Sequence, residues 1–180
     1  MNCFAGPLGS VHNYLAHIAL PNVVDYFDVV KSHRESSDRS TPAKYKELRL
    51  FINAVESLNN VLEYIYFHEG WHLKSVDLAD FRKKFCADNS TQFIAKISDY
   101  ANAYKHCQRG RFDAGSKTFT RNEKAVHAAD LQRTEIAFTV GMSVGRPLLD
   151  IQYNFDGIDN EALLGEAFRY WVDYLNAMGK

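Results

Sequence analysis

A long helix with one apolar face is the strongest pattern in the sequence. Between residues 42 and 68, apolar positions recur at alternating steps of three and four, which places them on one side of a helix. Pro42 suits the first turn of such a helix, and Gly70 can end it. About 26 residues at 1.5 Å each span roughly 40 Å, so several other elements must pack along this helix. Its apolar stripe consists of Leu48, Phe51, Val55, Leu58, Leu62 and Ile65.

The residues before the long helix predict two shorter helices. Apolar positions between residues 11 and 30 follow a helical period, but Pro21 lacks the N–H that a helix interior needs. We therefore expect a kink at Pro21, with Asn22 capping the second short helix. Residues 32–41 are rich in serine and charge, which predicts an exposed linker. Thr41 is the predicted N-cap of the long helix.

Three more helices are predicted after Gly70. Ser75 is the predicted cap of a short helix, Asn89 or Ser90 begins the next one, and Asp159 begins a terminal helix. The expected core positions are Leu78, Phe81 and Phe85 in the first, Phe93, Ile97, Tyr100 and Tyr104 in the second, and Leu164, Phe168, Trp171, Leu175 and Met178 in the third. The opposite side of the second helix carries Asp99, Asn102, His106 and Arg109.

The period changes from helical to alternating between residues 136 and 155. Residues 136–140 and 149–155 alternate apolar and polar positions around Gly145, Arg146 and Pro147, which predicts an antiparallel β-hairpin with one buried face. Because an isolated hairpin is marginal in water, it must lie on the helices or gain another strand, for which 117–120 is a weak candidate.

These patterns predict a mainly α protein, a four- to five-helix bundle with an appended antiparallel β-hairpin. At 180 residues the chain has the size of one domain, 1–180. The expected bundle core covers about 11–107 and 159–178, and a basic loop and the hairpin cover about 110–156.

Composition indicates a soluble globular protein, with 46% hydrophobic and 24% charged residues. No apolar run approaches the roughly 20 residues that a membrane helix needs, and no signal peptide is recognisable. Cys3, Cys86 and Cys107 are odd in number and widely spaced, so we expect free thiols. The predicted location is the cytoplasm, with no membrane partner.

The charge is unevenly distributed although the net value is only −1. Residues 105–124 contain six bases and two acids, and such a local patch can attract phosphates. A solvated loop is the commoner meaning of such a run. The bases are Lys105, Arg109, Arg111, Lys117, Arg121 and Lys124.

The string from His68 to His72 matches the zinc protease pattern H-E-x-x-H. There, two histidines one helical turn apart bind zinc, and the glutamate activates the bound water. Here the predicted helix end at Gly70 would separate His68 from His72. A helix C-terminus with favourably placed histidines is the alternative, and a metal-dependent hydrolase using His68, Glu69 and His72 stays open as a second hypothesis.

A second constellation occupies residues 99–106, where Asn102, Lys105 and His106 follow one another near a helix end. Together with the long helix around residues 51–58, this Asn-x-x-Lys-His ending resembles the HEPN superfamily (higher eukaryotes and prokaryotes nucleotide-binding) over roughly 42–107. Its members are small helical bundles. The resemblance implies a homodimer that binds nucleic acid or a nucleotide, and no cofactor.

Ribonucleases of that superfamily carry an arginine, a polar residue and then a histidine. The resemblance matches His106 to the histidine and Asn102 to the polar residue, whereas Ala101 stands where the arginine belongs. Arg109 or Arg111 would then have to hold a phosphate, with Lys105 beside them. The resemblance implies a nucleic-acid or nucleotide binder, with a degenerate ribonuclease as one form of it. A non-catalytic interaction module using the hairpin edge or residues 32–41 is a third hypothesis.

Overall fold

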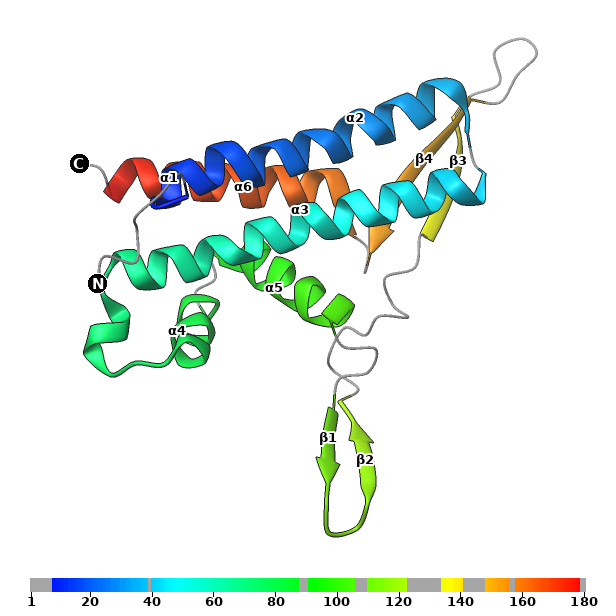
Figure 1. The fold of residues 1–180 in the computed structure, drawn as a ribbon. Coiled ribbons are helices and arrows are strands. Elements are labelled where there is room, and N and C mark those ends of the chain that lie inside the picture. Colours follow the sequence, from blue (N-terminus) through cyan, green and yellow to red (C-terminus); the bar gives the residue numbers. More distant parts are fainter. Residues whose placement is uncertain are drawn as a thin grey trace.

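The fold is described from a computed structural model. It describes residues 8–38, 40–87, 91–105, 110–122, 134–140, 148–155 and 158–178, with the side chains of 110–112, 134–140, 148–155 and 158 left out. Within these residues the protein is mainly helical, which confirms the predicted class. Figure 1 shows α2, α3 and α6 running side by side, with α4 and α5 on the other side of α3.

The central element is α3, Thr41–His68. Ser40, not the predicted Thr41, caps its N-terminus, because the Ser40 hydroxyl accepts a hydrogen bond from the Ala43 N–H at 3.3 Å. At the other end, Gly70 adopts φ 69°, a left-handed conformation that glycine enters without a Cβ clash, so the predicted helix end is confirmed. Five of the six predicted stripe residues are buried, and Leu48 is partly buried.

One helical run precedes α3, and a π-helical turn interrupts it next to Pro21, where the sequence predicts a kink; the second helix is longer than predicted. It comprises α1 (Val11–Tyr14), a π-helical turn (Leu15–Ala19) and α2 (Leu20–Ser36). In this wider π-helical turn, the Leu20 N–H donates to the Leu15 carbonyl. The turn ends just before Pro21, whose ring removes a backbone N–H donor from the helix. Asn22 is therefore inside the helix, and the predicted linker is wrong for residues 32–36.

Beyond Gly70 the chain forms a 3₁₀ turn (Trp71–Lys74), α4 (Leu78–Phe85), α5 (Gln92–Lys105) and α6 (Asn160–Met178). Asp77, and not the predicted Ser75, caps α4, because its carboxylate accepts the Asp80 N–H at 2.7 Å. The predicted start of α5 at Asn89 or Ser90 lies outside the described residues. Tyr104 was expected in the core, but it is 43% exposed.

The strands form two separate ladders. β1 (Gly110–Asp113) pairs antiparallel with β2 (Thr118–Arg121). β3 (Thr134–Val140) pairs antiparallel with β4 (Leu148–Phe155), and β5 (Ile158–Asp159) pairs with the end of β4. The proposed strand at 117–120 therefore does not extend the β3 and β4 pair. Residues 141–147 and the side chains of β3 and β4 lie outside the described part of the structure, so a hairpin with a buried face stays a prediction.

The core lies where α6 crosses α3. Trp171 of α6 is fully buried, and its indole N–H donates to the Leu58 carbonyl of α3 at 3.1 Å. In the same core, Phe51 of α3 packs against Tyr26 of α2 and Tyr100 of α5, with ring centroids 5.5 and 6.2 Å apart and the rings tilted by 57° in each pair. Among the described helices, none is long and apolar enough to span a membrane.

Candidate functional site

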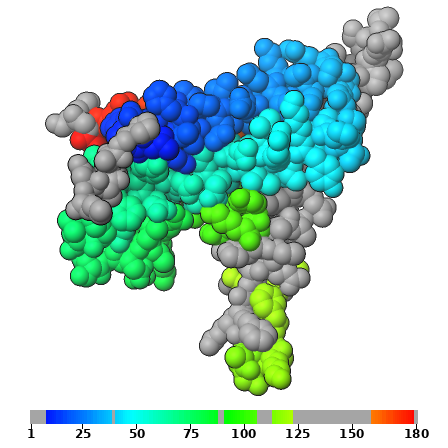
Figure 2. Space-filling model, in the orientation of Figure 1, coloured from blue at the N-terminus to red at the C-terminus, as the bar shows by residue number. Residues whose placement is uncertain are grey.

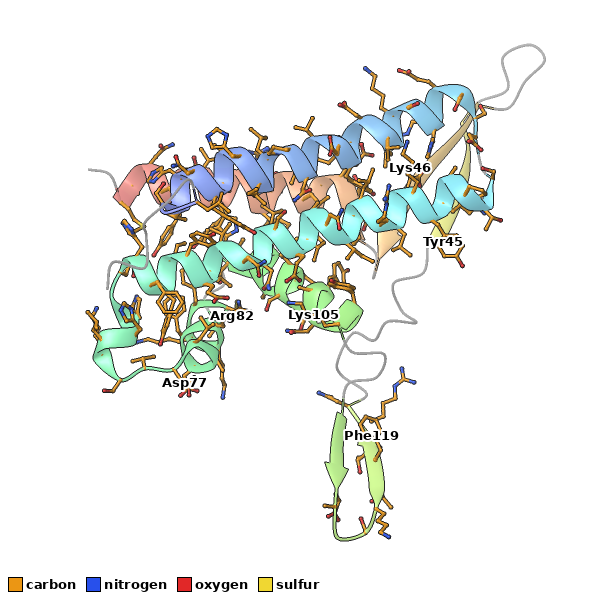
Figure 3. All side chains as sticks on the ribbon, viewed as in Figure 1. Tyr45, Lys46, Asp77, Arg82, Lys105 and Phe119 are labelled. Atoms are coloured by element: carbon orange, nitrogen blue, oxygen red, sulfur yellow. The ribbon has the colours of Figure 1, made fainter. Side chains whose placement is uncertain are left out.

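The sequence-predicted site at the end of α5 is described only as far as Lys105. Asn102 is half-buried on α5 and Lys105 is exposed, whereas His106 and Arg109 lie outside the described residues. The Lys105 ammonium forms an ion pair with Glu56 of α3, with 2.6 Å between Nζ and Oε1. Figure 3 shows Lys105 on α5, directly beside α3. Lys105 therefore balances a carboxylate of the bundle, which weakens its attraction for a phosphate.

Ala101 has no room for the arginine that the resemblance would place there. Its exposed fraction is 0%, and Ala103 is buried in the same way. An arginine at position 101 would put a charged, seven-atom side chain against a packed core, which is costly unless it is paired. The phosphate-holding role cannot be filled from this position of α5.

Glu56 of α3, the partner of Lys105, lies close enough to Tyr14 of α1 for its charge to act on the Tyr14 hydroxyl. Glu56 Oε2 is buried and has no hydrogen-bond partner among the described residues. Tyr14 of α1 stacks on Tyr64 of α3 with centroids 4.3 Å apart. Burial raises the pKa of Tyr14 from 10.0 to about 12, although a hydrogen bond with Asn60 opposes the shift. Lys105 supplies a cation that compensates the Glu56 carboxylate.

The basic run after α5 is displayed on the ladder of β1 and β2. Residues 113–122 are all exposed, and they include Lys117 in the turn and Arg121 at the end of β2. Figures 1 and 2 show this ladder projecting away from the helices, below the end of α5. Arg111 lies in β1 with Thr120 as its cross-strand partner. The ladder thus presents several bases outside the packed bundle.

The turn of the ladder is held by its one acid. The Asp113 carboxylate accepts hydrogen bonds from the Gly115 N–H at 2.9 Å and the Ser116 hydroxyl at 2.7 Å. The hydrogen bond from the Ser116 hydroxyl lowers the pKa of Asp113 most, and the one from the Gly115 N–H lowers it further. Lys117 adopts φ 53°, a left-handed conformation that closes the turn. Asp113 is therefore engaged with its own turn.

The H-E-x-x-H string does not have the geometry of a zinc protease. Because Gly70 ends α3 at His68, His72 lies in the following 3₁₀ turn and the two histidines do not share a helical face. The Glu69 carboxylate accepts hydrogen bonds from Trp71 Nε1 at 2.6 Å and the Tyr174 hydroxyl at 2.8 Å. Within the described ranges, no three His, Cys, Asp or Glu residues are grouped so that they could hold a metal ion.

A buried pair between α2 and α3 has no counterpart in the sequence predictions. His33 Nδ1 lies 2.7 Å from Glu47 Oε1, and both side chains are nearly buried. Glu47 lies four residues before Phe51, on the inner side of α3. A charged residue at this helical spacing from an apolar core position is the sequence signal that could have revealed the buried pair. Next to it, Arg34 forms a 2.7 Å ion pair with Glu161 of α6. The two pairs thus connect α2 to α3 and to α6.

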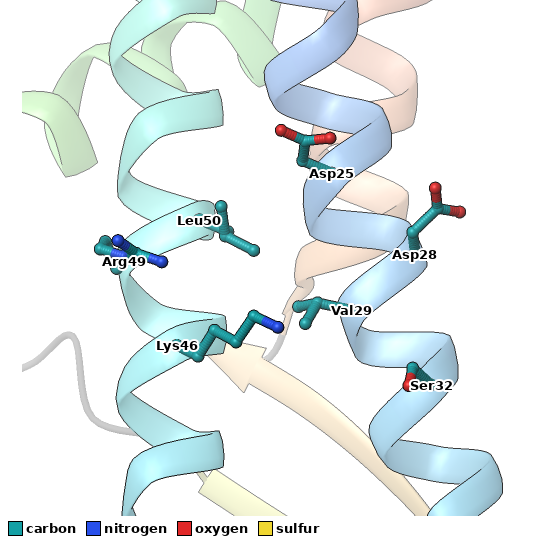
Figure 4. A pocket seen from close by; sticks show the side chains of 7 residues that line it. All are labelled: Asp25, Asp28, Val29, Ser32, Lys46, Arg49 and Leu50. Carbon is teal, nitrogen blue, oxygen red and sulfur yellow. The ribbon is translucent and has the colours of Figure 1, made fainter.

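A shallow groove of about 380 Å³ runs along the outer side of α2 and α3. Figure 4 shows Asp25 and Asp28 on α2 and Lys46 and Arg49 on α3. The lining contains two acids and two bases, so its net charge favours neither an anion nor a cation. Val29 and Leu50 lie along it and Ser32 completes its lining.

Comparison with known proteins adds no relative. Neither a family model, nor a curated protein, nor a solved structure matches the chain.

Proposed function

We propose that this chain binds nucleic acid through the ladder of β1 and β2, without cleaving it by the arginine and histidine pair of HEPN ribonucleases. The observation that carries the proposal is the exposed position of Lys117 and Arg121 on a ladder that projects from the bundle. Cations in solvent can approach a phosphate backbone at little desolvation cost, and their charge drives sequence-independent binding.

The surroundings of the basic residues support an anionic partner. Asp113 is the one acid of residues 110–122, and its carboxylate is occupied by Gly115 and Ser116. Arg111, Lys117 and Arg121 therefore leave this segment with a net positive charge. The resemblance to HEPN proteins agrees with a nucleic-acid partner, and Arg109 and His106 would lie between this ladder and α5 in the sequence.

Binding without cleavage is supported by the two residues at the end of α5. Ala101 is enclosed by the core, and Lys105 already compensates Glu56. We therefore assign binding mainly to the ladder, where Lys117 lies exposed in the turn, and only a secondary contribution to Lys105. The sequence pattern therefore lacks, at position 101, the arginine that HEPN ribonucleases carry beside the polar residue and the histidine.

Titration of a short fluorescein-labelled single-stranded RNA at low salt tests the proposal. The Lys117→Ala, Arg121→Ala double variant is expected to bind several-fold more weakly than wild type, because two phosphate contacts are lost. A Lys31→Ala, Lys83→Ala double variant is the matched control, since it removes the same charge from exposed positions on α2 and α4. Equal weakening of both variants, or no binding by wild type, would overturn the proposal.

The homodimer and the cytoplasmic location stay predictions. One chain has a mass of 20.6 kDa, so multi-angle light scattering distinguishes one copy from two directly. A dimer would bring two ladders to one nucleic acid and raise the apparent affinity by making the second contact intramolecular.

A further inference from the structure

We infer that the ladder of β1 and β2 recognises unpaired bases, with Phe119 as the stacking surface, so that the ligand is a single strand and not a duplex. The inference rests on the proposed function and specifies its substrate class. It depends on the side chains that the ladder presents, and not on its net charge.

Phe119 is the first observation. It lies in the middle of β2 and is 45% exposed, although a phenylalanine side chain normally gains free energy by burial. The other described side chains of the ladder, those of residues 113–122, are exposed as well, so none of them forms a core that covers the ring. An exposed ring on an extended strand is available to a planar ligand.

The register of the ladder is the second observation. Phe112 of β1 is the direct cross-strand partner of Phe119, and Gly110 is the partner of Arg121. Residues directly opposite each other belong to the same face of an antiparallel pair. The register thus pairs Phe119 with a second phenylalanine of the sequence, and Gly110, opposite Arg121, has no side chain that could obstruct a ligand.

The distribution of charge along β2 is the third observation. Because side chains alternate between the two faces of a strand, Phe119 and Arg121 share one face, and Thr118 and Thr120 share the other. Asp113 is the cross-strand partner of Thr118, so the acid of the ladder belongs to the face opposite Phe119. A ring and a cation two residues apart suit a base and its phosphate.

These features discriminate single strands from duplexes. Bases in a duplex are stacked on one another, and only those at its ends expose a ring face. An aromatic side chain can therefore add to the binding of a single strand but adds little to the binding of a duplex, which interacts through its phosphates. Phe119 should therefore affect only the binding of a single strand, whereas Lys117 and Arg121 should affect the binding of both a single strand and a duplex.

Paired titrations test the inference with one labelled RNA strand, alone and annealed to its complement. Phe119→Ala is expected to weaken single-strand binding about 5- to 150-fold and to change duplex binding by less than about twofold. Phe119→Leu keeps an apolar strand residue but has no π face, so it should weaken binding as Phe119→Ala does, and Phe119→Trp should restore it. Tyr45→Ala is the matched control, because Tyr45 is 68% exposed on α3, away from the ladder in Figure 3.

The outcomes separate the inference from the proposal that it extends. Binding that depends on Lys117 and Arg121 but is unchanged by Phe119→Ala would overturn the inference alone. Equal losses for single strand and duplex, or full binding by Phe119→Leu, would overturn it as well. No binding of either RNA by wild type would overturn the proposed function itself.

Discussion

Lys105 and Glu56 join α5 to α3 through an ion pair of 2.6 Å. The relationship changes the meaning of the Asn-x-x-Lys-His ending, because a lysine that compensates a carboxylate attracts phosphate less than an unpaired one. It also gives α5 a polar attachment next to its buried side, where Ile97, Tyr100 and Ala101 contact the core.

Replacement of Lys105 by alanine should affect stability slightly and RNA binding little. The lysine side chain is 41% exposed, so solvent screens the pair and the free energy of unfolding should fall by less than about 1 kcal/mol. Urea unfolding and the RNA titration measure the two effects. A loss of affinity as large as that of the Lys117→Ala, Arg121→Ala variant would show that Lys105 is a principal ligand.

Restoring the arginine of the HEPN pattern should damage the fold. Ala101→Arg places an unpaired charge and a long side chain in the core, and the free energy of unfolding should fall by about 3 kcal/mol or more. Asn102→Arg, at the neighbouring half-buried position, should be tolerated far better. Thermal unfolding compares the two. An Ala101→Arg protein as stable as wild type would contradict the enclosure of position 101 by the core.

The long-helix core was predictable, because a regular period of apolar residues is a local property of the sequence. Five stripe residues of α3 are buried as predicted, but additional positions, including Ala54 and Val61, are buried because helices cover α3 on more than one side. Tyr104 fits the same period on α5 and is exposed, since periodicity does not reveal where the neighbouring helices end.

Capping and ladder pairing were less predictable, for different physical reasons. Ser75 and Asp77 are both good caps, and only the backbone shows that Ser75 adopts a left-handed φ of 57° while Asp77 caps α4. The described side chains of the β1 and β2 ladder, at residues 113–122, are exposed, so they lack the alternation of buried and exposed positions that reveals a strand in a sequence. Its turn contains the hydrogen bonds of Asp113. His33 and Glu47 are separated by 14 positions, and their contact follows from helix packing.

The buried tryptophan of α6 should contribute strongly to stability. Trp171→Ala removes a fully buried ring and its hydrogen bond to Leu58, so the free energy of unfolding should fall by about 3 to 5 kcal/mol. Trp71→Ala should cost less, because that ring is only partly buried at the surface. Urea denaturation measures both. Equal costs would show that the contact between α3 and α6 is not the centre of the core.

Alkaline pH should destabilise the protein through Tyr14. Its pKa is raised from 10.0 to about 12 in the folded chain, chiefly by burial, so the unfolded chain loses this proton first as pH rises. The free energy of unfolding should therefore fall between about pH 10 and pH 12, and be unaffected by this group below pH 10. Burial also raises the pKa values of Tyr26 and Tyr174.

Comparison of Tyr14→Phe with wild type isolates that group. The variant should lose less stability over the same pH interval, and absorbance titration should show one fewer late-ionising tyrosine. An unchanged pH dependence would mean that the Tyr14 hydroxyl is not protected by its contacts with α3.

The ladder as the nucleic-acid contact is tested most directly by photochemical crosslinking. Wild-type protein is irradiated with a 5-iodouridine-containing single-stranded RNA, digested with trypsin and analysed by mass spectrometry. The predicted crosslink lies in the peptide that contains Thr118–Arg121, at Phe119, and it disappears in Phe119→Ala. A crosslink confined to α2, α4 or the groove between α2 and α3, with none in the ladder, would contradict the account.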